Sequence, residues 1–230
     1  MSRRLLLFDI DGTLLDTAGA GAAALLDAAE AVLEVSRGAL PPLDLAGSTD
    51  SVVVRKLFAD AGQPADASQM ERFITTYLAC LQSRLYAASF TGRLLPGVEQ
   101  LLAMLPADPR FVVGLLTGNV RAGALLKLER FGIQKPFIDG GFGDDAGLRH
   151  EIGAVAVQRL ASMTGLTFDP TTTIVIGDTP KDIACAQALG ARCLAVATGK
   201  FSVQDLEPLG AAMVLPDLAD TAAVLRFLAA

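Results

Sequence analysis

Short, continuous apolar runs separated by helical stretches constrain the fold of this chain more than any other feature of its sequence. Five such runs occur, one near the start and four after residue 110: 5–8, 111–116, 173–176, 192–196 and 212–215. Each run has the length of one strand, and its residues are predominantly apolar instead of alternating with polar ones. Such strands, joined by helices of ten or more residues, predict a parallel sheet covered on both faces. The expected core is therefore an α/β, Rossmann-like parallel sheet.

The segment between the first two runs carries only helical patterns. Apolar residues recur at helical spacing over about 18–36, 50–61 and 67–88, and no strand pattern appears between Leu15 and Gly92. An all-helical segment is thus inserted directly after the first strand. We expect a core domain formed by residues 1–16 and 92–230 and a helical cap domain formed by residues 17–91.

Composition and charge exclude several classes of protein. Hydrophobic residues make up 52% of the 230 residues, which excludes a disordered chain. No apolar run approaches the roughly 20 residues that span a bilayer, so we expect no membrane partner. The net charge of −6 comes without a basic patch, which argues against a nucleic-acid partner. Three cysteines without a CxxC pair indicate a reducing, cytoplasmic location. The pattern is compatible with a monomer or a homodimer.

Two carboxylates, Asp9 and Asp11, follow the first apolar run and precede Gly12 and Thr13. Alternation along an extended backbone sends both to the same side. Two acids held this close at the end of a buried strand repel each other, so they favour a bound cation over a purely structural role. The pair therefore suits a hard metal ion and an attacking carboxylate.

Further polar groups follow the next two strands. Thr117, Gly118 and Asn119 come after the second run, and Asp178 and Asp182 come after the third. The carboxyl ends of parallel strands meet at one edge of the sheet, so these groups are expected to converge. Carboxylates suit Mg²⁺, whereas the hydroxyl, the amide and a helix N-terminus suit phosphate. Together they predict a phosphoryl-transfer site.

Three motifs closely resemble signatures of the haloacid dehalogenase superfamily: DIDGT at 9–13, LLTGN at 115–119 and IGDTPKD at 176–182. The helical insert resembles the superfamily's C1-type cap, and the resemblance covers essentially the whole chain. It implies that Asp9 is the nucleophile, which becomes an aspartyl phosphate, and that Asp11 is the general acid and base.

The same resemblance implies the ligands. Asp9, the main-chain carbonyl of Asp11 and Asp178 are expected to hold Mg²⁺, with Asp182 supporting it directly or through water. The segment Thr117-Gly118-Asn119 is expected to bind the transferring phosphoryl group.

The superfamily also places a basic residue, usually lysine, ahead of the helix that leads to the third motif. Two residues are candidates, Arg149 and Lys135. Arg149 directly precedes the helical pattern that starts near Glu151, where the resemblance places this residue, whereas Lys135 lies earlier. Since a guanidinium also suits phosphate, Arg149 is the preferred phosphate-binding residue.

Asp11 favours a Mg²⁺-dependent phosphotransferase over a dehalogenase, because dehalogenases of the superfamily replace the second aspartate of the first motif. In the cap, the stretch from Leu45 to Asp50 is similar to the short loop that C1-cap phosphatases, including phosphoglycolate phosphatases, place in the active site, and Gly47, Ser48 and Thr49 are its candidate substrate-binding residues. That loop carries an arginine in β-phosphoglucomutases, and none here. The same residues also fit a helix N-cap.

These features predict a Mg²⁺-dependent phosphatase that hydrolyses a small phosphorylated metabolite through an aspartyl-phosphate intermediate. One alternative is a β-phosphoglucomutase-like phosphosugar mutase, which uses the same groups. Another, from a different class, is a non-catalytic signalling domain that accepts a phosphoryl group. The helical insert argues against the latter, since such a domain has no need of a lid over its aspartate.

Overall fold

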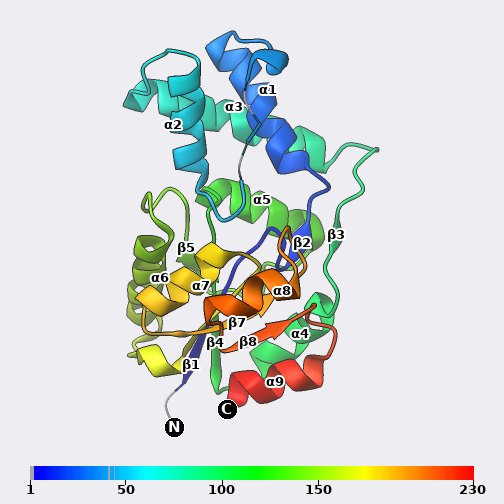
Figure 1. Cartoon of the computed structure of the whole chain (residues 1–230), viewed down its shortest axis with the longest axis vertical. Helices are drawn as coiled ribbons and strands as arrows, with labels where there is room; N and C mark the ends of the chain where they lie inside the picture. The colour runs from blue at the N-terminus through cyan, green and yellow to red at the C-terminus, as the bar shows by residue number, and fades with distance from the viewer. Residues whose placement is uncertain (1–2, 41, 44) are drawn as a thin grey trace.

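The computed structural model describes residues 3–40, 42–43 and 45–230 of the chain. The strands of its main sheet have the following bounds: β1 Arg4–Phe8, β4 Phe111–Leu116, β5 Gly140–Gly141, β6 Thr173–Gly177, β7 Arg192–Val196 and β8 Met213–Leu215. Within the described ranges these six strands pair in parallel in the order β5-β4-β1-β6-β7-β8 (Figure 1). The predicted α/β fold with a parallel sheet is confirmed. Sequence patterning did not indicate β5, because its two glycines carry no strand signal.

Strict alternation along the buried strands divides the core into two layers. In β1, Leu6 and Phe8 face one layer, and Leu5 and Leu7 face the other. The first layer contains α4 (Val98–Met104), α5 (Arg121–Phe131) and α9 (Thr221–Ala229); the second contains α6 (Arg149–Thr164), α7 (Pro180–Ala188) and α8 (Val203–Leu206). Helices therefore cover both faces of the sheet, and the strands can be apolar throughout.

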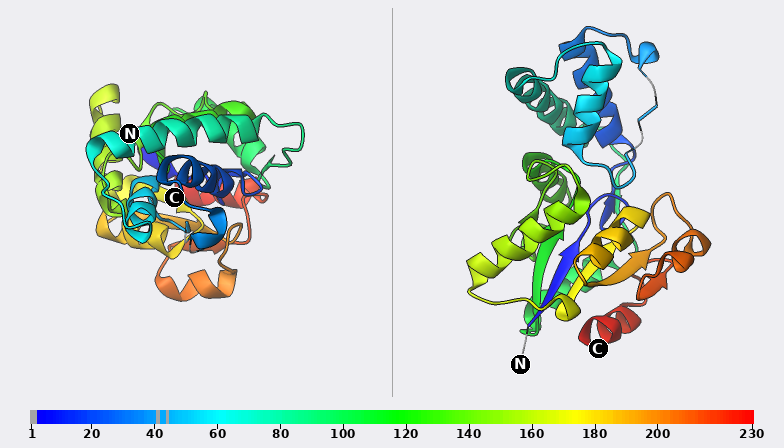
Figure 2. Two further views of the ribbon diagram at one scale, coloured as in Figure 1. Left: turned by 90° about the horizontal axis from the view of Figure 1, so that it is seen from above. Right: turned by 60° about the vertical axis from the view of Figure 1, so that its left-hand side comes forward.

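Three further helices, α1 (Ala20–Leu33), α2 (Asp50–Asp60) and α3 (Ala67–Leu85), lie beyond the carboxyl ends of β1 and β4 (Figures 1 and 2). We call these helices with their connections the cap and the rest of the chain the core. The cap has its own apolar cluster, which includes Leu25, Phe58 and Phe73. Its three helices agree with the three helical patterns in the sequence, although each ends earlier than expected.

A short antiparallel ribbon joins the cap to the core. It pairs β2 (Leu15–Asp16) with β3 (Arg93–Leu94), two residues on each side. The ribbon lies at the expected domain limits, and the division at 16/17 and 91/92 stays a prediction. In the described part of the chain, no helix is both long enough and apolar enough to cross a membrane.

Candidate active site

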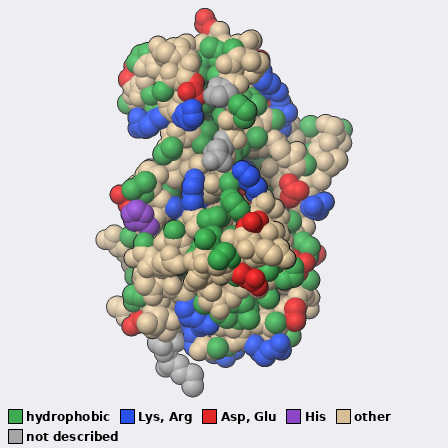
Figure 3. Space-filling view, in the orientation of Figure 1, with side chains coloured by type: hydrophobic (Ala, Val, Ile, Leu, Met, Phe, Trp, Pro, Cys, Tyr) green, Lys and Arg blue, Asp and Glu red, His purple; other side chains and the backbone are tan. Residues whose placement is uncertain are grey.

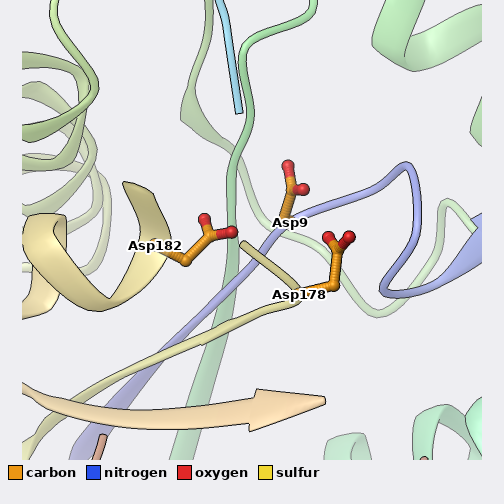
Figure 4. Close-up of side chains that lie close together, drawn as sticks. All are labelled: Asp9, Asp178 and Asp182. Carbon is orange, nitrogen blue, oxygen red and sulfur yellow. The ribbon is translucent and has the colours of Figure 1, made fainter. Parts of the chain in front are cut away.

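Three buried aspartates meet at the carboxyl edge of the sheet (Figure 4). Asp9 directly follows β1, Asp178 directly follows β6, and Asp182 lies in the first turn of α7. One carboxylate oxygen from each residue lies within 4.8 Å of those of the other two. The parallel sheet explains this convergence, because β1 and β6 are neighbours and end at the same edge.

The start of α7 fixes the position of Asp182. Thr179 is the N-cap and Pro180 the first helical residue, where its missing N–H has no consequence. Oδ2 of Asp182 accepts hydrogen bonds from the Thr179 amide at 3.0 Å and from its hydroxyl at 2.6 Å. Oδ1 accepts from Nε of Arg149 at 2.7 Å. Both oxygens of Asp182 are thus already engaged, and the residue stabilises the helix end as well as joining the cluster.

Burial makes this cluster electrostatically costly in the absence of a cation. Burial, followed by repulsion from Asp9 and Asp182, raises the pKa of Asp178 to about 8. Burial also raises the pKa of Asp9 to about 6, although Arg149 opposes the shift. Asp178 receives one side-chain hydrogen bond from the described residues, from the Thr13 hydroxyl at 3.2 Å. Oxygen donors that repel one another in this way fit a hard divalent cation.

Arg149 is the buried counter-ion of the cluster. It is the first residue of α6, and Nη2 lies 2.8 Å from Oδ1 of Asp9 and 2.6 Å from Oδ1 of Asp182. Nη2 also donates to the carbonyl oxygen of Leu116 at 3.2 Å. Lys135, the other candidate, is exposed and does not line the cavity described next. The geometry therefore places Arg149, not Lys135, at the site.

A cavity of about 410 Å³ lies between the core and the cap. Most residues predicted from the sequence line it: Asp9, Asp11, Gly47, Ser48, Thr117, Gly118, Asn119, Arg149 and Asp178. Two do not, since Asp182 lies behind Arg149 and Thr49 is the buried N-cap of α2. Lys and Arg side chains flank the hollow between the two lobes in Figure 3, and Lys200 lines the cavity itself.

The carboxylate of Asp11 points away from the acidic cluster, toward a network that the sequence did not reveal. Its Oδ2 accepts from Nδ2 of Asn119 at 2.7 Å and from Nζ of Lys127 at 2.6 Å. Nζ of Lys127 also donates to Oδ1 of Asn119 at 2.6 Å, and Nδ2 of Asn119 donates to the buried Thr117 hydroxyl at 2.8 Å. Lys127 lies on α5 with 4% of its side chain exposed. A lysine at a helical position normally indicates a solvated face, so no sequence signal identified it.

The cap loop, residues 47–49, contacts the core at the edge of the cavity. Nζ of Lys181 donates to the hydroxyl of Ser48 at 2.9 Å, and the Asp50 amide donates to the Gly118 carbonyl oxygen at 2.7 Å. The Thr49 hydroxyl accepts from the Val52 amide at 3.3 Å, so the N-cap interpretation of this loop also holds.

Asp50, the last residue of the cap-loop stretch, is a second buried group at the site, and the sequence predicted no role for its side chain. Its Oδ2 accepts from the Val120 amide at 2.9 Å, and burial raises its pKa to about 6. It lines the cavity from the first turn of α2.

Comparison with known proteins agrees with this geometry. The family described as haloacid dehalogenase-like hydrolase matches residues 6–187. The chain belongs to this family. Over 225 residues it is 29% identical to a phosphoglycolate phosphatase from Caulobacter vibrioides, which covers 93% of this chain and 86% of that protein. It is 28% identical over 230 residues to a phosphoglycolate phosphatase from Rhodospirillum rubrum, covering 94% and 88%.

Solved structures of this haloacid dehalogenase fold extend the likeness to the whole chain. A β-phosphoglucomutase from Clostridium difficile superposes with a TM-score of 0.72 over 100% of this chain and 98% of its own, at 16% identity. That likeness concerns the fold alone. The family and its phosphatase relatives identify the chain as a phosphatase, which excludes the non-catalytic alternative. Phosphatases of this family generally use a divalent metal, and the acidic cluster offers a site for one.

Proposed function

We propose that the enzyme is a Mg²⁺-dependent phosphatase that transfers the phosphoryl group of a small metabolite to Asp9 and then to water. One observation carries this proposal: the buried Asp9 belongs to the acidic cluster and also lines the cavity. A group in that position can reach a phosphoryl group while a cation offsets its charge.

The acidic cluster fits Mg²⁺ by its donors. Asp9, Asp178 and the main-chain carbonyl of Asp11 would hold the ion, with Asp182 supporting the cluster through Arg149. Bound there, Mg²⁺ would supply positive charge to the phosphoryl oxygens and to the Asp9 carboxylate.

The chain's own groups would perform the proton and phosphoryl transfers. A carboxylate oxygen of Asp9 attacks phosphorus as the ester oxygen leaves, and Asp11 donates a proton to that oxygen. Asp11 then takes a proton from the water that cleaves the aspartyl phosphate. Asn119 and Lys127 hold Oδ2 of Asp11, so the carboxylate keeps one orientation through both steps.

The phosphoryl oxygens need hydrogen-bond donors, which the carboxylates do not supply. Thr117, whose hydroxyl already accepts from Asn119, retains its own proton for donation. Gly118 and Arg149 line the same cavity and can add the Gly118 amide and the guanidinium as donors, whereas the Thr117 amide already donates to the Gly141 carbonyl oxygen. We assign phosphate binding to this set.

The cap would open at the β2–β3 ribbon for exchange of substrate and product, and close to exclude bulk water. The cytoplasm is the proposed location, since the three cysteines are free thiols. Whether the enzyme is a monomer or a homodimer stays a prediction.

Phosphate release from para-nitrophenyl phosphate tests the proposal. The wild-type enzyme should release phosphate with Mg²⁺ and lose this activity with a chelator, and Asp9→Asn should be inactive. Equal phosphate release by the wild-type enzyme and Asp9→Asn would show that Asp9 is not the nucleophile. Conversion of a hexose 1-phosphate to its 6-phosphate, without release of phosphate, would instead indicate the mutase.

A further inference from the structure

The first turn of α2 is held to the core by hydrogen bonds to which the proposed phosphoryl transfer assigns no role. The Asp50 amide donates to the Gly118 carbonyl oxygen at 2.7 Å, and Oδ2 of Asp50 accepts from the Val120 amide at 2.9 Å. Oγ of Ser51 donates to the Gly143 carbonyl oxygen at 2.7 Å. Since α2 belongs to the cap and these partners belong to the core, the bonds form only when the cap is closed (Figure 1).

The two Asp50 bonds reach both ends of a segment that carries groups of the active site. Gly118 and Val120 flank Asn119, whose side chain donates to Oδ2 of Asp11. The Gly118 amide is itself one of the donors assigned to the phosphoryl group. Asp50 therefore holds, from the cap, the residue on each side of Asn119.

Gly118 makes this segment dependent on its neighbours. Glycine has more backbone freedom to lose on folding than any other residue, so an ordered glycine needs support from outside. A side chain cannot supply that support, because a Cβ atom on Gly118 would overlap the Ser48 carbonyl oxygen. On the other side, a Cβ atom on Gly143 would overlap the Gly118 carbonyl oxygen, and the Gly143 amide donates to the Asn119 carbonyl oxygen at 2.7 Å. Residues 118–120 are thus packed between the cap loop and the loop at Gly143.

The Asp50 carboxylate serves the core more than its own helix. Acidic residues are common in the first turn of a helix, where they interact favourably with the dipole of that helix. In α2, however, the Thr49 hydroxyl already accepts from the Val52 amide, and Oδ2 of Asp50 is bonded to Val120, the N-cap residue of α5. Only 9% of Asp50 is exposed, and burying a carboxylate costs free energy. This cost is offset at the contact with the core, which indicates a role there.

We propose that Asp50 is a positioning residue for phosphoryl transfer: from the cap, it fixes the backbone of residues 118–120 in the arrangement that binds the phosphoryl group. This inference rests on the proposed phosphatase function. It gives the cap a part in forming the phosphate site, in addition to excluding water from it. Because Asp50 acts through Gly118 and Val120 and not on the leaving group, its loss should weaken phosphoryl transfer from every substrate to the same extent.

Two substrates with unlike leaving groups, para-nitrophenyl phosphate and acetyl phosphate, test this role. Asp50→Ala removes the acceptor of the Val120 amide, and we expect it to lower kcat/KM for both substrates by the same factor, at least about tenfold. Asp50→Asn keeps an acceptor oxygen and should recover most of the loss. Equal kcat/KM for wild type and Asp50→Ala, or losses that differ clearly between the substrates, would overturn the positioning role. No phosphate release by the wild-type enzyme from either substrate would overturn the proposed function itself.

Ser51→Ala is the matched control for cap closure. It removes a hydrogen bond between α2 and the core that does not reach residues 118–120. If Asp50 served only to hold the cap closed, the two alanine variants would lose activity alike. We expect Ser51→Ala to stay within about threefold of the wild-type kcat/KM. Equal losses in the two variants would contradict the role of Asp50.

Inhibition by orthovanadate separates the phosphate site from the leaving group, because this anion mimics the transferring phosphoryl group alone. Its inhibition constant against para-nitrophenyl phosphate should rise at least about tenfold in Asp50→Ala and should stay near the wild-type value in Ser51→Ala. An inhibition constant that Asp50→Ala leaves unchanged would contradict the proposed action on residues 118–120.

Hydrogen exchange at the Val120 amide, measured by NMR, reports on the contact without catalysis. In the wild-type enzyme this amide should exchange slowly, and in Asp50→Ala at least about tenfold faster, while the amides of β4 keep their wild-type protection. Unprotected exchange at Val120 in the wild-type enzyme would overturn the proposal without the need for any variant to fold.

Discussion

Nη2 of Arg149 lies 2.8 Å from Oδ1 of Asp9, and the two side chains are among the most buried charged groups of the enzyme. The same guanidinium holds Asp182, so one cation offsets two carboxylates. Removing it leaves two buried carboxylates without this counter-ion. Loss of a buried counter-ion lowers the free energy of unfolding far more than loss of an exposed ion pair does.

We therefore expect Arg149→Met to lower the free energy of unfolding by about 3–5 kcal/mol. Arg159→Met is the control on the same helix, because Arg159 pairs with Asp145 at a more exposed position. Its loss should be about 1 kcal/mol or less. Urea unfolding of both variants measures the difference, and equal losses would contradict the counter-ion role of Arg149.

Asp50 makes stability depend on pH. Its pKa is about 6 in the folded enzyme and 3.8 in the reference state, so the folded chain retains this proton at higher pH than the unfolded chain does. Wild-type stability should fall as pH rises from about 4 through 6 because of this group. The Asp50→Asn variant lacks this loss. Between pH 4 and pH 7, its free energy of unfolding should therefore rise by on the order of 3 kcal/mol relative to that of wild type.

Unfolding by urea at several pH values measures this difference. Asp27→Asn should change the pH dependence of stability in the opposite direction. A hydrogen bond from Arg84 lowers the pKa of Asp27, so the ionised carboxylate stabilises the folded state at neutral pH, and this contribution is lost in acid. The same pH dependence for wild type and Asp50→Asn would show that Asp50 ionises normally.

Metal removal should be visible in stability as well as in activity. Mg²⁺ at a hundredfold excess over its dissociation constant should stabilise the wild-type enzyme by about 2.7 kcal/mol. Asp178→Asn should lose this gain, and without metal it should be at least as stable as wild type, since it relieves repulsion in the cluster. Thermal unfolding with Mg²⁺ and with a chelator checks both points. Asp217→Asn, in the loop before α9 and outside the acidic cluster, should respond to Mg²⁺ like wild type.

Gly118 controls the contact between the cap loop and the core. A Cβ atom there would overlap the carbonyl oxygen of Ser48, so Gly118→Ala should displace the loop that carries Gly47 and Ser48. We expect kcat/KM to fall about a hundredfold, since a shift of about 1 Å is enough to disturb alignment. Gly38→Ala, where an added Cβ meets nothing within 4 Å, should retain the wild-type value.

The sequence predicted those parts of the fold that a local pattern determines. Continuous apolar runs identified β1, β4, β6, β7 and β8, and helical spacing identified the three cap helices. It did not predict β5 or the β2–β3 ribbon, because strands of two residues have no periodicity to detect.

The sequence likewise predicted only some residues of the candidate site. Asp9, Asp11, Thr117 and Asp178 follow strands directly, so the order of strand ends was enough to bring them together. Lys127 and Asp50 lie on helices, where a charged residue normally faces solvent. Only the packing of α5 and α2 against the cavity reveals that they are buried. Their absence from the sequence prediction reflects tertiary structure that no local pattern encodes.

The central claim is that Asp9 carries the phosphoryl group, and trapping that intermediate tests it most directly. Enzyme turning over 2-phosphoglycolate or para-nitrophenyl phosphate with Mg²⁺ is quenched in acid, treated with borohydride to convert an acyl phosphate to a stable product, and analysed as peptides by mass spectrometry. We predict modification of the peptide that contains Asp9, at that residue, and none in Asp9→Asn. Modification at another residue, or turnover by Asp9→Asn at the wild-type rate, would contradict the proposed mechanism.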